Sequence, residues 1–326
     1  MHTGIPTPLV AIIGAAGFIG RRLTSALAAH AEVATYTRER SFMQGADLTP
    51  PLRTADVVFY LATSINPALG ERHPEWAAAD HRRFARLLHE LALLESPPTV
   101  VLTSSGGTVY DPSAPLPYTE QSPTRATCLY AAAKLAAEGE LAERAGVIPS
   151  VILRLSNIYG PGQRAGKDQG VLAYWLAAAA RRETLRVIGD PDSTRDYLYI
   201  DDVTACMCLV FEAVMRRPGL AASGPLTLNV GSGGRTSLAE LIEVVQSLAE
   251  GDLPVEMWPA RRLDRPHVWL DSGKANRVLG WRPQTRLADG VAAMWHELGG
   301  RTMTGTHAAL GARQAAAPGA IPGQAV

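Results

Sequence analysis

The sequence predicts an α/β fold in which a parallel β-sheet is covered by helices on both faces. Short apolar segments alternate with longer segments of helical composition along the N-terminal half, as in a series of βαβ units. Several of the apolar segments end in small or hydroxylated residues, and the first runs into a glycine-rich turn. At 326 residues the chain is long enough for one large domain or two coupled lobes.

The elements of this pattern can be placed in chain order. Strands are predicted over 9–13, 32–36, 55–63, 98–105 and 150–157, and helices over 21–30, over 75–95 and from about Tyr130. After these the alternation weakens, with a loop at 160–170, a helix at 171–183, short strands and turns at 185–203, and amphipathic helices at 237–250 and 286–298. The segment 299–326 is rich in Gly, Ala and Pro, so we expect a disordered, dispensable tail.

Composition excludes several classes of function. Lys plus Arg and Asp plus Glu each number 31, so a formal charge of zero gives no support for a nucleic-acid or membrane partner. The N-terminus lacks the pattern of a signal peptide, and no apolar run is long enough to span a membrane. Three cysteines argue against a disulfide framework, and no metal site is predicted. A soluble cytoplasmic protein is therefore expected.

The glycine-rich turn GAAGFIG lies between the first strand and the first helix. Gly14, Gly17 and Gly20 would let the backbone approach a pyrophosphate, which then sits at the helix N-terminus. Such a turn at the first strand of an α/β chain indicates a dinucleotide site.

The end of the second strand should select the dinucleotide. An Asp or Glu there binds the ribose 2′-hydroxyl of NAD, whereas an Arg favours the 2′-phosphate of NADP. Thr37 takes the place of the acid and is followed by Arg38 and Arg40. The sequence therefore leaves NAD and NADP open.

A second motif, YAAAK, places Tyr130 and Lys134 four residues apart on one helix face. A nearby ammonium lowers the pKa of a phenol because it favours the ionised form. A phenol tuned in this way can take a proton from a sugar hydroxyl or give one to a ketone.

Together these motifs resemble the extended short-chain dehydrogenase/reductases, in the nucleotide-sugar epimerase/dehydratase family and similar to UDP-glucose 4-epimerases. The resemblance covers about 9–298 through GAAGFIG, LAT, TSSGGTVY, YAAAK, RLSNIYGPGQ, RDYLYIDDV, NVGSG and LGWRP, in family order. It implies a Rossmann-type doubly wound parallel sheet with a smaller C-terminal α/β substrate lobe. The NAD(P)-binding domain would comprise 9–165 and a returning segment at about 196–230, and the nucleotide-sugar lobe 166–195 and 231–298.

The resemblance also implies two sets of site residues. Asp47 and Leu48 should meet the adenine, and Leu61 to Thr63 should line the cofactor channel. The full cofactor set is Gly14, Gly17, Phe18, Ile19, Gly20, Thr37, Arg38, Asp47, Leu48, Leu61, Ala62, Thr63, Tyr130 and Lys134. The substrate set is Ser105, Gly106, Asn157, Arg195, Arg261 and Asp264. For Arg195 the alternative is a surface ion pair with Asp192 or Asp196.

The catalytic hydroxyl is ambiguous because the family usually has Ser or Thr three residues before the Val of the V-Y pair, where this chain has Gly106. Ser104 and Ser105 cannot both face the site, since successive strand residues point in opposite directions. Ser105 is predicted, because the following glycine pair could bend it inward, and Thr108 is the alternative.

By the same resemblance, the expected activity is epimerisation of a nucleotide-diphosphate sugar at C4 through a transient 4-keto intermediate. Tyr130 would be the base, Ser105 would hydrogen-bond the same oxygen, and Lys134 would hold the nicotinamide ribose, with NAD as cofactor and a homodimer as the assembly. An NADPH-dependent 4-keto-sugar reductase is the alternative, favoured by Arg38 and Arg40, and a non-catalytic NADP sensor is a third possibility. Dehydration is disfavoured because glycines replace the Asp-Glu pair it would need.

Overall fold

The structure, a computed structural model, describes residues 7–164, 170–261 and 264–299. Six parallel strands form the central sheet in the order β12-β7-β6-β5-β1-β2. Their bounds are β1 Leu9–Ile13, β2 Glu32–Tyr36, β5 Val57–Tyr60, β6 Thr99–Ser105, β7 Ser150–Leu155 and β12 Leu226–Val230. The predicted tail falls almost wholly on 300–326, which lies outside the described residues.

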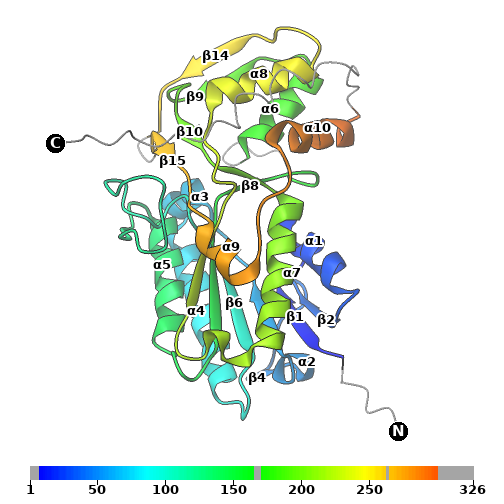
Figure 1. Ribbon diagram of the computed structural model, residues 1–326, viewed down its shortest axis with the longest axis vertical. Coiled ribbons are helices and arrows are strands. Elements are labelled where there is room, and N and C mark those ends of the chain that lie inside the picture. The colour runs from blue at the N-terminus through cyan, green and yellow to red at the C-terminus, as the bar shows by residue number, and fades with distance from the viewer. Residues whose placement is uncertain (1–6, 165–169, 262–263, 300–326) are drawn as a thin grey trace, which may run out of the picture.

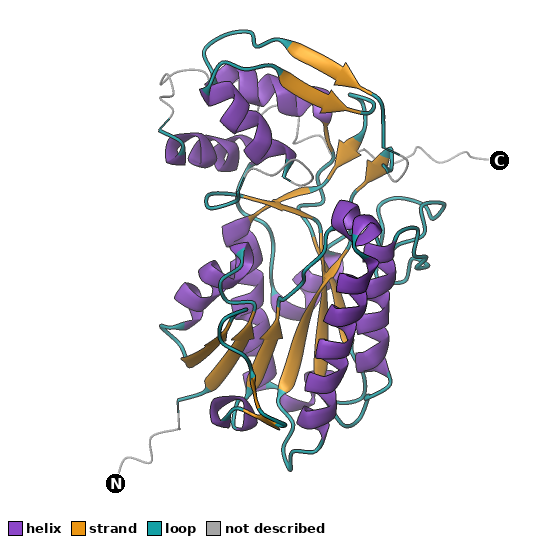
Figure 2. Cartoon of the chain, turned by 180° about the vertical axis from the view of Figure 1, so that it is seen from behind, coloured by secondary structure: helices purple, strands orange, loops and turns teal. Residues whose placement is uncertain are grey.

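Helices cover both faces of this sheet (Figures 1 and 2). They are α1 Phe18–Leu27, α2 Pro50–Arg53, α3 Pro67–Arg72, α4 Pro74–Ala92, α5 Leu129–Ala142, α7 Ile200–Arg216 and α9 Gly273–Leu279. Strand β1 shows why two layers form: Val10 and Ile12 pack in one apolar core with α1 and α7, whereas Ala11 and Ile13 pack in the other with α4 and α5. A strand buried on both faces needs the continuous apolar run that the sequence has here.

A smaller group of elements stands beyond the C-terminal ends of the strands, at the top of Figure 1. It contains α6 Val171–Ala180, α8 Leu238–Leu248, α10 Leu287–Glu297, β9 Leu185–Ile188 and β14 Val255–Trp258. Its own apolar core includes Trp175, Leu176 and Val245. The predicted α/β fold with a smaller C-terminal lobe is confirmed.

Short pieces complete the chain. They are β3 Met43–Gln44, β4 Asp47–Leu48, β8 Asn157–Tyr159, β10 Thr194–Arg195, β11 Tyr197–Tyr199, β13 Thr236–Ser237, β15 His267–Val268 and the 3₁₀-helix Pro218–Ala221. Strand β8 pairs with β11, and β10 pairs with β13 and β15, so these ladders lie where the two groups of elements meet.

Two expectations from the sequence need correction. Helix α7 was not predicted, although buried apolar residues such as Val203, Met207, Val210 and Val214 recur along one face and two acidic residues mark its first turn. The segment around α9 was assigned to the substrate lobe, yet Ala275 and Trp281 belong to a core of the large sheet. Trp281 also donates its indole N–H to the carbonyl of Asp202 in α7.

Candidate active site

The glycine-rich turn is held tightly between the ends of two strands. Gly14 has φ +95°, and a side chain there would come within 2.9 Å of the backbone nitrogen of Ala62, just after β5. The N–H groups of Gly14 and Ala15 both donate to the carbonyl of Tyr36, at 2.9 and 3.1 Å. A side chain at Gly20 would overlap the carbonyl of Gly14. Only glycine at 14 and 20 permits this geometry.

An open cleft lies beside this turn, between the start of α1 and the end of β2. It is lined by Ala15, Ala16, Arg21, Thr24, Thr35 and Thr37. Gly17 is the N-cap of α1, and no side chain caps the helix, so its first N–H groups are available to an anion. Phe18 and Ile19, both half-buried, form the first turn of that helix. The shape and polarity of the cleft suit a pyrophosphate.

The residues after β2 form a compact polar turn. The Thr37 hydroxyl donates to the Glu39 carboxylate at 2.7 Å and accepts from the N–H groups of Glu39 and Arg40. Arg38 is exposed, and the Arg40 guanidinium lies 5.9 Å from the centre of the Tyr36 ring. Since the Thr37 hydroxyl is used within the turn, the segment presents two guanidinium groups and the exposed Glu39 carboxylate between them.

The predicted adenine contacts lie in a short hairpin formed by β3 and β4. Asp47 is exposed, whereas Leu48 is only 5 % exposed and belongs to the core beneath α4. The adenine-binding role of both residues stays a prediction.

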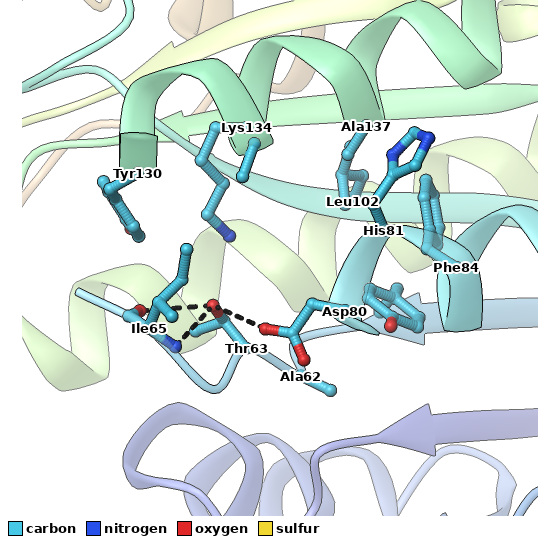
Figure 3. Close-up of a pocket in the computed structure, with 12 residues that line it drawn as sticks. Ala62, Thr63, Ile65, Asp80, His81, Phe84, Leu102, Tyr130, Lys134 and Ala137 are labelled. Carbon is cyan, nitrogen blue, oxygen red and sulfur yellow. Dashed lines mark hydrogen bonds between the residues drawn. The ribbon is translucent and has the colours of Figure 1, made fainter. Parts of the chain in front are cut away.

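Tyr130 and Lys134 line one cavity at the C-terminal ends of β5 and β6 (Figure 3). Helix α5 carries both side chains, and its N-cap is Cys128, whose sulfur accepts from the N–H of Ala131. The cavity is also lined by Tyr60, Ala62, Thr63, Ile65, Asp80, His81, Phe84, Leu102, Ala133 and Ala137. The structure thus brings the YAAAK motif and the predicted channel residues Ala62 and Thr63 together.

The electrostatics of this pair differ from the sequence expectation. Burial raises the pKa of Tyr130 to about 12, and a hydrogen bond with Ser105 offsets only part of that rise. Burial also lowers the pKa of Lys134 to about 8, although the negative charges of Asp80 and Glu138 act to raise it. Its ammonium donates to the carbonyl of Thr103 at 3.0 Å and lies 5.7 Å from the centre of the Tyr130 ring. The expected lowering of the phenol pKa by Lys134 is wrong for the protein alone.

The three candidate hydroxyls have different surroundings. The Ser105 side chain is close enough to Tyr130 to favour ionisation of the phenol, whereas the buried Ser104 donates to Glu138 Oε1 at 2.5 Å. The Thr108 hydroxyl is buried and meets no hydrogen-bond partner among the described residues. The two serines therefore face opposite ways, and Ser105 is the one beside the phenol.

Gly106 has a steric reason to lack a side chain. A side chain there would overlap the side chain of Leu270. The N–H of Gly106 donates to the carbonyl of Leu155 at 2.8 Å. The family's usual hydroxyl position is thus filled by a leucine that comes from far along the chain. The substrate contact assigned to buried Gly106 stays a prediction.

The remaining predicted substrate residues lie where the two groups of elements meet. The side-chain amide of Asn157 donates to the carbonyl of Asp196 at 3.2 Å. The Arg195 guanidinium donates to the carbonyls of Thr194 and Pro266, at 2.9 and 3.2 Å, rather than pairing with Asp196. The Asp196 carboxylate accepts instead from the Ser232 hydroxyl and from two backbone N–H groups.

Arg261 and Asp264 are exposed and close a turn on each other. The Arg261 N–H donates to Asp264 Oδ2 at 2.8 Å, and the Asp264 N–H donates to the carbonyl of Arg261 at 3.0 Å. Their substrate-binding role stays a prediction.

Sequence reasoning missed two carboxylates beside the site. Asp80 accepts from the N–H and hydroxyl of Ser64, at 2.5 and 2.8 Å, and fixes the channel segment after β5. Glu138, buried one helical turn beyond Lys134, binds the guanidinium of Arg154 at 2.6 Å. The spacing of Tyr130, Lys134 and Glu138, each four apart, was the available signal for the second carboxylate.

Comparison with known proteins follows from this geometry. The model of the family described as "NAD dependent epimerase/dehydratase family" matches residues 10–231. The chain belongs to the NAD dependent epimerase/dehydratase family. The resemblance drawn from the motifs is confirmed, and the NAD dependence of the family agrees with the first of the two cofactors expected.

Individual members of the family differ in the reaction that their names state. The chain is 32 % identical over 306 residues to a UDP-glucose 4-epimerase of Mycolicibacterium smegmatis, covering 86 % of this chain and 95 % of that protein. It is 31 % identical over 316 residues to a dTDP-6-deoxy-L-talose 4-dehydrogenase (NAD(P)(+)) of Kitasatospora kifunensis, covering 88 % and 94 %.

A similar solved structure supports the fold. The UDP-glucuronic acid 4-epimerase of Bacillus cereus, in complex with UDP-glucuronic acid and NAD, has a TM-score of 0.79 at 20 % identity, with 89 % of this chain and 99 % of that chain covered. In the described part of this chain, no helix combines the length and apolarity that crossing a membrane requires. Within the same ranges, no three His, Cys, Asp or Glu side chains cluster as metal ligands.

Proposed function

We propose that the protein is an NAD-dependent nucleotide-sugar epimerase that inverts C4 through a transient 4-keto intermediate. The observation that carries the proposal is that Tyr130 and Lys134 line one cavity, with Ser105 beside the phenol, in a chain that also has a dinucleotide-type glycine turn. The epimerase named above, which matches nearly its whole length, supports the same reaction class. We also infer that the sheet domain holds the dinucleotide, that the smaller lobe holds the nucleotide-sugar, and that the enzyme is a homodimer.

The residues present fit a dinucleotide. Gly14, Gly17 and Gly20 leave room for a pyrophosphate at the start of α1, and Thr37 lines the cleft that leads from it. Ala62 and Thr63 line the cavity of Tyr130 and Lys134, and the backbone of Leu61 and Ala62 lies against Gly14 of the glycine-rich turn. NAD⁺, when bound, supplies the hydride acceptor and a positively charged ring.

Tyr130 is the proton-transfer group in this proposal. With a pKa near 12, it is protonated at neutral pH and ready to donate to a ketone oxygen. To take a proton from the sugar hydroxyl, Tyr130 must first be ionised, and a positive charge nearby favours the phenolate. Ser105, beside the phenol, is placed to hydrogen-bond the same sugar oxygen, and Lys134 is held by the Thr103 carbonyl to bind a ribose hydroxyl.

The reaction can be tested directly. Purified protein is incubated with UDP-glucose and, separately, with dTDP-glucose, without added dinucleotide, and the products are separated by anion-exchange chromatography. An epimerase converts one of them to the C4 epimer, and the denatured protein releases NAD because no net redox change consumes the cofactor. Failure to interconvert any nucleotide-sugar, with no dinucleotide released, refutes the proposal.

A 4-keto-sugar reductase is the second candidate. Arg38 and Arg40 follow β2, where a cation can bind a 2′-phosphate, and the dehydrogenase relative named above is equally similar. A reductase consumes NADPH in proportion to a dTDP-4-keto-sugar and is purified without tightly held NAD. The two outcomes separate the candidates, and turnover of either kind excludes a non-catalytic sensor.

A further inference from the structure

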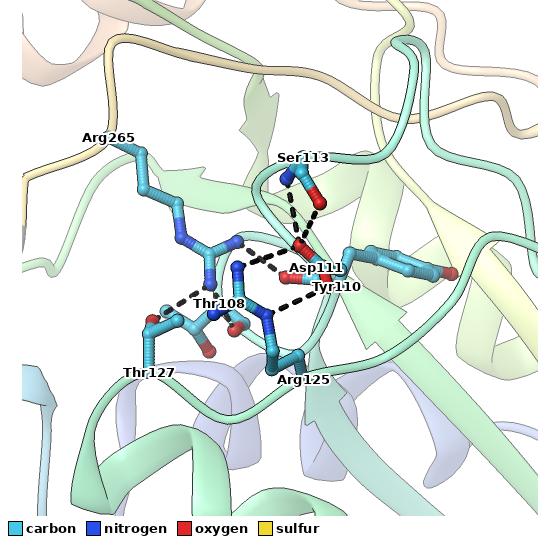
Figure 4. A network of polar contacts seen from close by, with 7 residues as sticks. All are labelled: Thr108, Tyr110, Asp111, Ser113, Arg125, Thr127 and Arg265. Carbon is cyan, nitrogen blue, oxygen red and sulfur yellow. Dashed lines mark hydrogen bonds and ion pairs between the residues drawn. The ribbon is translucent and has the colours of Figure 1, made fainter.

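One guanidinium from the smaller lobe binds the loop that joins β6 to α5 (Figure 4). Arg265 lies between β14 and β15 and is half-buried. Its Nη1 donates to the carbonyl of Tyr110 at 2.9 Å. Its Nη2 donates to the carbonyl of Thr108 at 2.7 Å and to the Thr127 hydroxyl at 3.1 Å. These three acceptors come from the two ends of the loop.

The bonded positions flank the candidate catalytic groups. Thr108 follows Ser105 at the start of the loop, and Thr127 precedes Tyr130 at its end. Arg265 therefore links the two chain segments whose separation sets the distance between the serine hydroxyl and the phenol. Two hydrogen bonds to main-chain carbonyls constrain the backbone itself, and not only side-chain rotamers.

Other contacts hold the loop farther from the site. The N–H of Asp111 donates to the carbonyl of Pro123 at 2.8 Å, and the N–H of Arg125 donates to that of Val109 at 2.9 Å. The exposed Arg125 guanidinium also pairs with the Asp111 carboxylate at 2.8 Å. These bonds close the outer part of the loop. Next to the two groups, the Gly106 N–H donates to the carbonyl of Leu155 and the Leu129 N–H to the Glu71 carboxylate, and Arg265 bridges the two ends of the loop.

Arg265 also follows directly on the segment proposed to bind the nucleotide-sugar. Asp264 is its neighbour, and Arg261 is bonded to Asp264 through the backbone. On its other side, the carbonyl of Pro266 accepts from Arg195. A ligand that orders these groups therefore acts on the backbone that carries Arg265.

We propose that Arg265 is a positioning residue through which the nucleotide-sugar segment holds Ser105 and Tyr130 at their working separation. The inference rests on the proposed function, in which these two groups act on one sugar oxygen. Methionine at 265 keeps most of the aliphatic stem of the side chain and removes all three hydrogen bonds. Because a displacement of about 1 Å in reacting groups can cost about 10²-fold in rate, kcat should fall by roughly that factor.

The test compares Arg265→Met, Arg265→Lys and the matched control Arg125→Met, which removes an exposed arginine from the same loop. Interconversion of UDP-glucose and UDP-galactose gives kcat and KM, and the dinucleotide content of each purified protein is measured. For Arg265→Met we expect kcat to fall about 10²-fold, with unchanged dinucleotide content and KM. Lysine should restore part of kcat, because an ammonium can still donate to the carbonyls, and Arg125→Met should behave as wild type. A kcat for Arg265→Met near wild type, or an equal loss in the control, overturns the inference.

A second measurement does not depend on turnover. Trypsin cleavage after Arg125 is followed by mass spectrometry in wild type and in Arg265→Lys and Arg265→Met, with and without UDP. UDP should slow cleavage in wild type more than in the variants. If UDP slows cleavage equally in wild type and in the variants, the inference is overturned even where the enzyme is active. If UDP slows cleavage more in wild type, the inference is supported even where no nucleotide-sugar is turned over. The two proposals therefore fail separately.

Discussion

Removal of the Ser105 hydroxyl should lower turnover without weakening the fold. Ser105 and Tyr130 are both partly exposed, and the phenol lines a cavity, so water can replace the hydroxyl that alanine removes. One hydrogen bond to the reacting oxygen contributes about 1.5 kcal/mol, or roughly tenfold in kcat. The loss reaches about 10²-fold where the hydroxyl stabilises charge that develops on that oxygen. The free energy of unfolding should stay within about 0.5 kcal/mol of wild type.

Ser104→Ala should have the opposite effect. The Ser104 hydroxyl donates to the buried Glu138 carboxylate at 2.5 Å. Its loss removes one of three donors, and Arg154 still supplies two, at 3.1 and 2.6 Å. Loss of a hydrogen bond to a buried charged group costs about 1.5–3 kcal/mol of stability. Turnover should stay within about threefold of wild type, because the side chain points away from the phenol.

Thr108→Val should change neither quantity much. The Thr108 hydroxyl is buried with no hydrogen-bond partner among the described residues, so a methyl group of the same shape relieves its desolvation. Stability should be unchanged or rise by about 1 kcal/mol. The main-chain carbonyl that Arg265 binds is retained.

The three variants are compared by urea unfolding and by steady-state kinetics with the nucleotide-sugar that wild type turns over. We expect Ser105→Ala to lose turnover alone, Ser104→Ala to lose stability alone, and Thr108→Val to lose neither. Equal small effects on kcat in all three would mean that a backbone N–H or a water holds the sugar oxygen. A larger loss of kcat in Thr108→Val than in Ser105→Ala would show that Thr108, and not Ser105, supplies the catalytic hydroxyl.

Three further predictions follow from the same site. Tyr130→Phe should lower turnover by about 10²–10⁴-fold and leave dinucleotide content unchanged; retention of more than a tenth of the activity would show that Tyr130 is not the proton-transfer group. Because burial lowers the pKa of Lys134 to about 8, the unfolded chain binds more protons between pH 8 and 10, so the free energy of unfolding should rise across that window. Lys134→Met should remove about 2 kcal/mol of this rise, as measured by urea unfolding at each pH. An unchanged rise would show that burial does not lower the pKa of Lys134. Glu138→Gln leaves the buried Arg154 without its charged partner and should cost about 3 kcal/mol of stability; a loss below about 1 kcal/mol would contradict the burial of that pair.

Local patterns predicted much of the frame of this protein. The strands that begin at Leu9, Glu32 and Ser150 lie where apolar runs are short and bounded by turn residues. The glycine-rich turn was predictable because its steric requirement is local: Gly14 and Gly20 touch the turn itself and the next strand end. Helix α7 was missed although its buried residues Val203, Met207 and Val210 recur at helical spacing, so this periodic signal was present in the sequence.

The choice between Ser104 and Ser105 shows how far such reasoning extends. Strand alternation predicted that the two hydroxyls face opposite ways, and in the structure Ser104 bonds Glu138 whereas Ser105 lies beside Tyr130. Why position 106 has no side chain was not predictable, since the obstructing atoms belong to Leu270 in another part of the chain. Arg265 escaped notice for the same reason, because its acceptors lie in the loop between β6 and α5.

The phenol of Tyr130 depends even more on contacts that spacing does not encode. Four-residue spacing brings Lys134 to the same helix face, but the effect of a cation on a phenol depends on desolvation of both groups. Burial disfavours the ionised form of both groups: it raises the pKa of Tyr130 to about 12 and lowers the pKa of Lys134 to about 8. The ammonium is bonded to the Thr103 carbonyl, and its charge is balanced by Asp80 and Glu138 rather than directed at the phenol. In the protein alone, the neighbour that favours ionisation of Tyr130 is therefore Ser105, which comes from another element of the fold.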